Sequence, residues 1–234
     1  MISLGLSHEF QSALEKKGIT ISRVLIGFNC VIPILALTFL TFNLSLVSIM
    51  LMVCLQIGIM YTSKRKKSGA SKTIRYFSLL HLFWIVVPVC LFYQIRVMED
   101  GYKFVFYLIL CSTVGDSFAY YIGKNFGKIK LSKTISPNKT LEGFVASFFS
   151  SVIICTLFLL WNNILPFPEA IILSMFINVS SQVGDLAESK FKRYCGIKDT
   201  STLIPGHGGL LDRLDTYLFS VPMLFLLLFY LDVI

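Results

Sequence analysis

Long apolar segments alternate with short polar segments along this chain of 234 residues. Most of the apolar segments approach the roughly 20 residues that a helix needs to cross the hydrocarbon core of a bilayer. The pattern therefore predicts an all-α polytopic membrane protein with about seven transmembrane helices, one of which is short (170–183). The predicted spans are approximately 24–40, 44–61, 77–93, 104–122, 144–161, 170–183 and 217–233.

The N-terminal stretch, residues 1–20, has a mixed polar composition that includes Glu9, Glu15, Lys16 and Lys17. This composition predicts no cleavable signal peptide. We expect either a short amphipathic arm on the membrane surface or a loose terminus.

Composition strengthens the membrane interpretation. The chain is 55% hydrophobic and 15% charged, whereas soluble domains carry about 25% charged residues. Six cysteines are present, none in a CxxC pair, and five lie in apolar segments. We interpret them as small buried apolar residues and not as a disulfide framework or a zinc site.

The distribution of positive charge predicts the orientation. With the N-terminus in the cytoplasm, the segments 1–23, 62–76, 123–139 and 184–213 lie on that side and contain 19 of the 21 Lys and Arg residues. The formal net charge of +8 then indicates a cytoplasmic membrane face and anionic ligands, and not nucleic acid. The basic cluster Lys64–Lys67 is expected to determine topology by touching anionic lipid heads.

The densest run of charge and glycine, residues 189–215, is called the signature segment below. Asp212 and Asp215 are three residues apart, so they share one face if a helix continues from Leu211. Gly208 and Gly209 allow the backbone to approach a ligand closely. Paired carboxylates, a glycine turn and nearby cations together predict a divalent metal that holds a polyphosphate. The cations are Lys192, Arg193, Lys198 and Arg213.

A second group of polar residues lies between 115 and 143. Asp116 falls in an apolar run, where a carboxylate requires a cation or a donor as partner. Thr140 and Glu142 either form the N-terminal cap of the next helix or contact substrate. Lys139 at that helix start opposes the helix dipole, which a bound phosphate would explain.

Both groups resemble the phosphatidate cytidylyltransferase (CDP-diacylglycerol synthase) family. Its pattern of Ser, apolar, Lys-Arg, then Lys-Asp, then Pro-x-His-Gly-Gly, apolar, x, Asp-Arg, apolar, Asp is filled from Ser189 to Asp215. Its Asp-Ser/Thr-x-Ala-Tyr and Ser-Pro-x-Lys-Thr-x-Glu-Gly segments correspond to Asp116–Tyr120 and Ser136–Gly143. Three positions depart from the common residues of the family, namely Asn138, Leu141 and Ser201.

The resemblance covers roughly the C-terminal half. We therefore divide the single membrane domain into residues 1–100, with the arm and the first three transmembrane helices, and residues 101–234, the catalytic region. The chain is short for the family, which leaves room for one further N-terminal span.

The resemblance implies an integral-membrane nucleotidyltransferase of phospholipid biosynthesis with its active site on the cytoplasmic face. It would transfer CMP from CTP to phosphatidate, giving CDP-diacylglycerol and pyrophosphate, with Mg²⁺ or Mn²⁺ as cofactor. The expected metal ligands are Asp185, Asp212 and Asp215, with Asp116 as a further candidate. Ser136 and Lys139 are assigned to the lipid phosphate and His207 to the leaving pyrophosphate. Other expected phosphate contacts come from Lys192, Arg193, Lys198, Arg213 and the backbone of Gly208 and Gly209.

Alternatives remain open at this point. The same chemistry could act on another lipid phosphate, such as an isoprenoid-ether lipid. A transporter or a non-catalytic membrane protein is a further alternative, although transporters place charges near the bilayer midplane and contain repeats. Asp199 is either a metal ligand or a salt-bridge partner of Lys198 or Arg193. The bilayer and the two substrates are the expected partners, and a homodimer is a candidate assembly.

Overall fold

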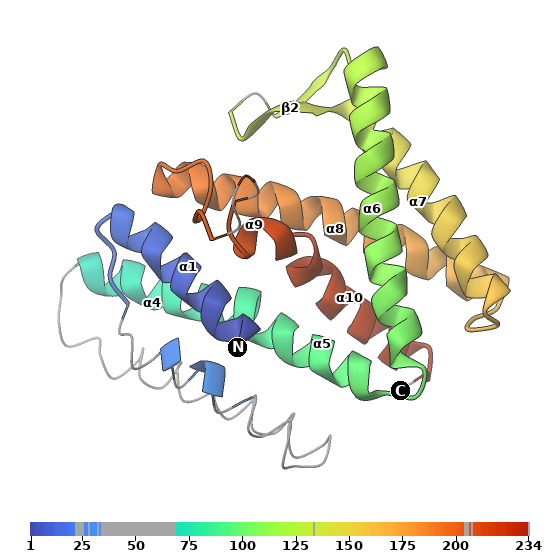
Figure 1. Ribbon diagram of the computed structural model, residues 1–234, viewed down its shortest axis with the longest axis horizontal. Helices are drawn as coiled ribbons and strands as arrows, with labels where there is room; N and C mark the ends of the chain where they lie inside the picture. Colours follow the sequence, from blue (N-terminus) through green and yellow to red (C-terminus); the bar gives the residue numbers. More distant parts are fainter. Residues whose placement is uncertain are drawn as a thin grey trace. The chain divides into compact units, whose positions relative to one another are not determined.

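The computed structural model (Figure 1) describes residues 1–21, 26–27, 29–31, 33, 69–132, 134–203, 206 and 208–233, without the side chains of 69–72. The predicted spans 24–40 and 44–61 lie largely or wholly outside these residues. The cluster Lys64–Lys67 and His207 also lie outside the described residues.

Five helices in the described residues are long and apolar enough to cross a membrane. They correspond to the last five predicted spans, so the all-α membrane architecture is confirmed. The total of seven stays a prediction. The five helical segments are Thr73–Val97, Gly101–Phe126, Leu141–Trp161, Phe167–Cys195 and Leu211–Tyr230.

The chain packs as two compact units. Unit 1 comprises residues 1–94 and 194–213, and unit 2 comprises residues 95–193 and 214–234. The signature segment is thus divided between them. The sequence-based division into residues 1–100 and 101–234 follows the extent of the family resemblance and stays a prediction.

In unit 1, helix α1 (Ile2–Lys16) buries one apolar side that includes Leu6, Phe10 and Leu14. The Phe10 ring centroid lies 6.5 Å from that of Phe77 and 6.2 Å from that of Trp84. These partners belong to α4 (Gly69–His81) and the π-helical turn η2 (Leu82–Val86), which continue into α5 (Val87–Val97). The alternative of a loose N-terminus is therefore wrong, because burial of this apolar side fixes the helix.

In unit 2, α6 (Gly101–Phe126) packs along α7 (Leu141–Trp161), as Figure 1 shows. A methyl group on Gly115 would lie 2.7 Å from Ser147 Oγ and 2.9 Å from Ser151 Oγ. The Ser151 hydroxyl donates to the Cys111 carbonyl at 3.1 Å. Small residues and buried hydroxyls are typical of closely packed membrane helices, where apolar burial supplies little driving force between helices.

A two-stranded antiparallel hairpin joins α6 to α7. Its strands are β1 (Lys130–Ser132) and β2 (Ser136–Thr140). The Gly143 backbone N–H donates to Thr140 Oγ1 at 3.2 Å, and the Ile129 N–H donates to the Glu142 carboxylate at 3.2 Å. The predicted N-cap at Thr140 is confirmed, and both contacts fix the hairpin against the start of α7.

Helix α8 (Phe167–Cys195) is 29 residues long and extends well beyond the predicted apolar span 170–183. The polar residues after Val183 include strong helix formers, so apolar character ends before the helix does. The C-terminal helices are α9 (Leu211–Leu214) and α10 (Tyr217–Tyr230), with a turn at 215–216 between them. Asp212 and Asp215 therefore do not share one uninterrupted helix.

Candidate active site

A cavity of about 670 Å³ in unit 2 contains four of the predicted site residues: Asp116, Ser136, Lys139 and Asp185. They come from α6, β2 and α8, so three separate elements position them. The wall between them is partly apolar and partly glycine. It includes Ala119, Gly123, Gly127, Leu131, Gly143, Phe144 and Leu186.

The Lys139 ammonium donates to Asp185 Oδ2 across this cavity. Both side chains are partly buried, with exposed fractions of 32% for Lys139 and 27% for Asp185. Burial lowers the pKa of Lys139, and the carboxylates of Asp215, Asp116 and Glu188 act in the opposite direction. A partly buried cation surrounded by carboxylates can exchange its partners for the phosphate of a ligand.

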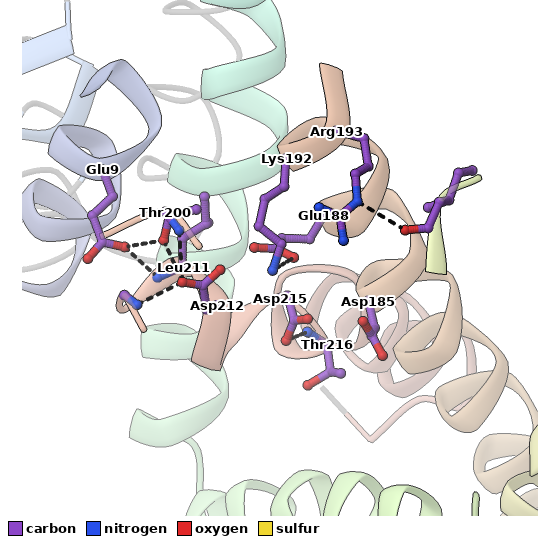
Figure 2. A network of polar contacts seen from close by, with 12 residues as sticks. Glu9, Asp185, Glu188, Lys192, Arg193, Thr200, Leu211, Asp212, Asp215 and Thr216 are labelled. Atoms are coloured by element: carbon purple, nitrogen blue, oxygen red, sulfur yellow. Dashed lines mark hydrogen bonds and ion pairs between the residues drawn. The ribbon is translucent and has the colours of Figure 1, made fainter. Parts of the chain in front are cut away.

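Glu188 and Lys192 form a second ion pair one helical turn apart on α8 (Figure 2). Lys192 Nζ lies 2.7 Å from Glu188 Oε2, and the Glu188 side chain is fully buried. Burying a carboxylate requires a charged or hydrogen-bonding partner, so Glu188 restrains the direction of Lys192. Sequence reasoning assigned Lys192 and missed Glu188, although their i, i+4 spacing indicates a pair.

Arg193 and Asp215 make contacts with the backbone. Arg193 Nε donates to the Ile135 carbonyl in the hairpin at 3.4 Å. Asp215 Oδ1 accepts from the N–H of Thr216, a residue that lines the cavity, at 2.8 Å. A methyl group on Gly184 would lie 2.7 Å from the Asp215 carbonyl oxygen, so this glycine lets α8 approach the turn that carries Asp215.

In unit 1, Asp212 Oδ2 accepts three hydrogen bonds from its own loop. The donors are Thr200 Oγ1 at 2.9 Å, Thr200 N at 3.0 Å and Gly209 N at 2.7 Å. Gly208 has φ +80°, and a methyl group there would lie 2.7 Å from Asp212 Oδ2. A glycine is thus needed at position 208 for two reasons: the backbone is left-handed there, and a side chain would collide with the Asp212 carboxylate.

Glu9 of α1 reaches the same loop (Figure 2). The residue is 3% exposed. Its Oε1 accepts from Ser201 Oγ at 2.6 Å and Leu210 N at 2.9 Å. Its Oε2 accepts from Thr200 Oγ1 at 3.2 Å and Leu211 N at 2.7 Å. Sequence reasoning missed this residue, because nothing near Glu9 in the sequence indicates partners about 200 positions away.

The remaining predicted residues of the signature segment lie at the surface of unit 1. Lys198, Asp199 and Arg213 are exposed. Within the described ranges, no salt bridge joins Asp199 to Lys198 or Arg193.

The carboxylates of the site are candidate ligands for a divalent cation. Among the described residues, no group of three His, Cys, Asp or Glu side chains is arranged to hold a metal ion. Mg²⁺, however, usually binds through one or two carboxylates together with water and substrate phosphates. Asp116 and Asp185, which open onto the cavity, fit a cation that arrives with a polyphosphate.

The cysteines agree with the sequence interpretation. Five of the six are described, and all five are free and buried: Cys30, Cys90, Cys111, Cys155 and Cys195.

The sequence is similar to a known family of proteins. The model of the cytidylyltransferase family matches residues 1–231. A phosphatidate cytidylyltransferase of Bacillus subtilis (strain 168) is 38% identical over 148 residues, which is 62% of this chain and 55% of that protein. The phosphatidate cytidylyltransferase of Staphylococcus aureus (strain COL) is 39% identical over 157 residues, 65% of this chain and 58% of that protein. The chain thus spans somewhat more than half the length of the curated relatives it matches.

Proposed function

This chain belongs to the cytidylyltransferase family, and we propose that it transfers CMP from CTP to phosphatidate, giving CDP-diacylglycerol and pyrophosphate. The curated relatives carry the name of that activity. The observation that carries the proposal is the unit 2 cavity. There, the cation of Lys139 is held by the carboxylate of Asp185, and the hydroxyl of Ser136 belongs to a residue that lines the same cavity.

The cavity has the chemistry that a lipid phosphate and a nucleotide require. Lys139, Lys124 and Lys130 contribute positive charge, and Phe144 and Leu186 contribute apolar surface. A lipid phosphate needs both, since its head is anionic and its chains are apolar. Gly123 and Gly127 also line the cavity, and their lack of a side chain leaves room for Thr140, since a methyl group on either would lie within 2.9 Å of Thr140 Oγ1.

The proposed reaction is a single in-line displacement. A phosphate oxygen of phosphatidate attacks the α-phosphorus of CTP, a new oxygen–phosphorus bond forms, and the bond to the β-phosphate oxygen breaks. The nucleophile is already anionic, so the protein needs to position the groups and neutralise their charge more than to remove a proton. We assign Lys139 and Ser136 to the lipid phosphate and Lys192 and Arg193 to the triphosphate.

Mg²⁺ or Mn²⁺ is the proposed cofactor, and it would neutralise charge on the triphosphate. Asp185, Asp212, Asp215 and Asp116 are its proposed ligands. The ion pair with Glu188 would restrain the Lys192 ammonium. The four aspartates would then remain available to bind the metal ion. His207, Lys198 and Arg213 are assigned to the phosphates that leave as pyrophosphate.

The active site is proposed to face the cytoplasm, where CTP is available. The support is the concentration of 19 of the 21 Lys and Arg residues in four segments that lie on one side in the predicted topology. These segments include the hairpin of unit 2 and most of the signature segment.

The direct test uses detergent-purified full-length chain, radiolabelled CTP and a panel of lipid phosphates. We expect labelled CDP-diacylglycerol and equimolar pyrophosphate with phosphatidate, and loss of both after chelation with EDTA. Restoring Mg²⁺ or Mn²⁺ should restore turnover. If an isoprenoid-ether lipid phosphate reacts faster than phosphatidate, that lipid is the substrate and the proposed choice of phosphatidate is wrong.

A Lys139→Met variant is the matched negative control for the same assay. It should still fold, although with a lower thermal midpoint, and lose product formation with every lipid phosphate. If the parent chain forms no CDP-lipid from any of them under conditions where a related enzyme is active, the proposed transfer reaction is wrong for this chain.

A further inference from the structure

The buried carboxylate of Glu9 accepts four hydrogen bonds from residues of the loop that precedes Asp212. Its four donors are Thr200 Oγ1, Ser201 Oγ and the backbone N–H groups of Leu210 and Leu211. They come from both ends of the loop 200–211. One side chain of α1 therefore ties the beginning of this loop to its end.

Glu9 is also linked to Asp212 through a shared partner. Thr200 Oγ1 lies 3.2 Å from Glu9 Oε2 and 2.9 Å from Asp212 Oδ2. A hydroxyl has one proton, so it donates to one of these carboxylates at a time. Any shift of Glu9 thus changes the donors available to Asp212.

The charge of Glu9 is costly at this position. Among the described residues, no Lys or Arg forms a salt bridge with it, and the residue is 3% exposed. A buried carboxylate is stabilised only by charge or by hydrogen bonds. Here its stabilisation comes from the donors of the loop, so the loop and Glu9 depend on each other.

We propose that Glu9 is a positioning residue that holds the loop 200–211 so that the Asp212 carboxylate keeps the orientation needed for the metal–nucleotide complex. This inference rests on the proposed function, in which Asp212 is a metal ligand. Glu9 contacts no substrate in this scheme and acts through Thr200 and the backbone of the loop. Substitution of Glu9 should therefore weaken the binding of CTP and Mg²⁺ more than the binding of phosphatidate.

The test compares Glu9→Gln with Glu15→Gln in the full-length purified chain. Both changes remove one negative charge from α1, but Glu15 is exposed and contacts Gln11. Gln at position 9 keeps the shape and turns an amide NH₂ group toward one pair of donors. Ser201→Ala is a third variant that leaves the carboxylate in place and removes the 2.6 Å hydrogen bond to Glu9, together with the 3.1 Å bond that Ser201 Oγ accepts from the Leu203 N–H.

The first readout, hydrogen–deuterium exchange by mass spectrometry, does not depend on activity. In Glu9→Gln, amide exchange in peptides covering 198–215 should be at least tenfold faster than in the parent, with the α6 and α7 peptides unchanged. Glu15→Gln should match the parent. Parent-like exchange at 198–215 in both Glu9→Gln and Ser201→Ala would overturn the proposal.

The second readout is steady-state kinetics. Glu9→Gln should raise the KM for CTP and the half-saturating Mg²⁺ concentration at least tenfold, while the KM for phosphatidate changes less than threefold. A lower kcat with all of these constants unchanged would indicate a purely structural role and overturn the proposal. If Glu9→Gln does not fold, Ser201→Ala decides by the same criteria. If the parent has no activity, the proposed function fails, and faster exchange in the variant then supports only the holding of the loop by Glu9.

Discussion

Gly209 and Glu9 approach so closely that a methyl group on Gly209 would lie 2.5 Å from Glu9 Oε2. Thr200 Oγ1 would lie 2.3 Å from the same methyl group. The glycine of the signature segment thus accommodates side chains of the protein itself. A glycine is therefore required at position 209 for packing inside the protein, whether or not a ligand is bound.

We predict that Gly209→Ala lowers the thermal midpoint and reduces turnover at least tenfold. The added methyl group must displace Glu9 or Thr200, and overpacking of this kind costs about 1–3 kcal/mol. Thermal unfolding followed by size-exclusion chromatography and the CTP assay measure both effects. Gly196→Ala is the control, because Gly196 has φ +73° and open space around its Cα. It should lose some stability and keep its turnover, and an equal loss of turnover in both variants would contradict this explanation.

The ion pair of Lys139 and Asp185 leads to a second prediction. Lys139→Met or Asp185→Asn alone leaves a partly buried charge without its partner, which destabilises the fold. The double variant Lys139→Met/Asp185→Asn should recover thermal stability. Because both residues are assigned to substrate or metal, all three variants should lose at least a hundredfold in turnover.

The exposed pair Lys103–Asp100, with Nζ and Oδ2 2.6 Å apart, is the matched control. Surface pairs contribute about 0–1 kcal/mol, so Lys103→Met should change neither stability nor turnover appreciably. Retained activity in the double variant of Lys139 and Asp185 would show that this ion pair serves the fold alone.

Much of the site could be predicted because its residues lie in local patterns. Asp116, Ser136 and Lys139 belong to two short motifs and Asp185 precedes the signature segment. Helices α6 and α8 and strand β2 bring all four to one cavity. The cap at Thr140 could likewise be predicted from the residues next to it. Caps, short motifs and the positions of apolar spans can be predicted from sequence, since they depend on near neighbours.

The contacts of Glu9 depend on residues 191 to 202 positions away. No periodicity or motif in an N-terminal arm indicates such partners. The end of α8 was missed for a different reason. Hydropathy falls after Val183, while Glu188, Lys190 and Lys192 favour helix as strongly as many apolar residues do.

Topology provides the third prediction. The turn that contains Asn163 lacks Lys and Arg and should face away from the cytoplasm, as should the loop 41–44, which lies outside the described residues. Asn163 is exposed, so Asn163→Cys should react with a membrane-impermeant maleimide applied to intact cells. Lys128→Cys, in the exposed segment that precedes the hairpin, should react only after permeabilisation. Reversed accessibility of these two positions would overturn the orientation.

The last prediction separates the structural role of Asp212 from its proposed chemical role. The hydrogen bonds that its side chain accepts from Thr200 and Gly209 all end on Oδ2. The Asn side chain has one carbonyl oxygen, which can accept the same three bonds, and Asn caps helices as well as Asp does. Asp212→Asn should therefore fold with a thermal midpoint close to that of the parent.

Metal binding should respond differently, because the amide carries no charge. We expect Asp212→Asn to lower kcat by roughly a thousandfold, the scale of losing a major electrostatic stabiliser, with partial recovery at high Mg²⁺. Asp215→Asn should behave in the same way, since Asp215 Oδ1 accepts only the Thr216 N–H at 2.8 Å among the described hydrogen bonds. Thr113→Val, at an exposed hydroxyl that bonds its own helix, provides a near-neutral reference. A folded Asp212→Asn or Asp215→Asn variant with turnover within a few-fold of the parent would assign that aspartate to the fold and remove it from the metal site.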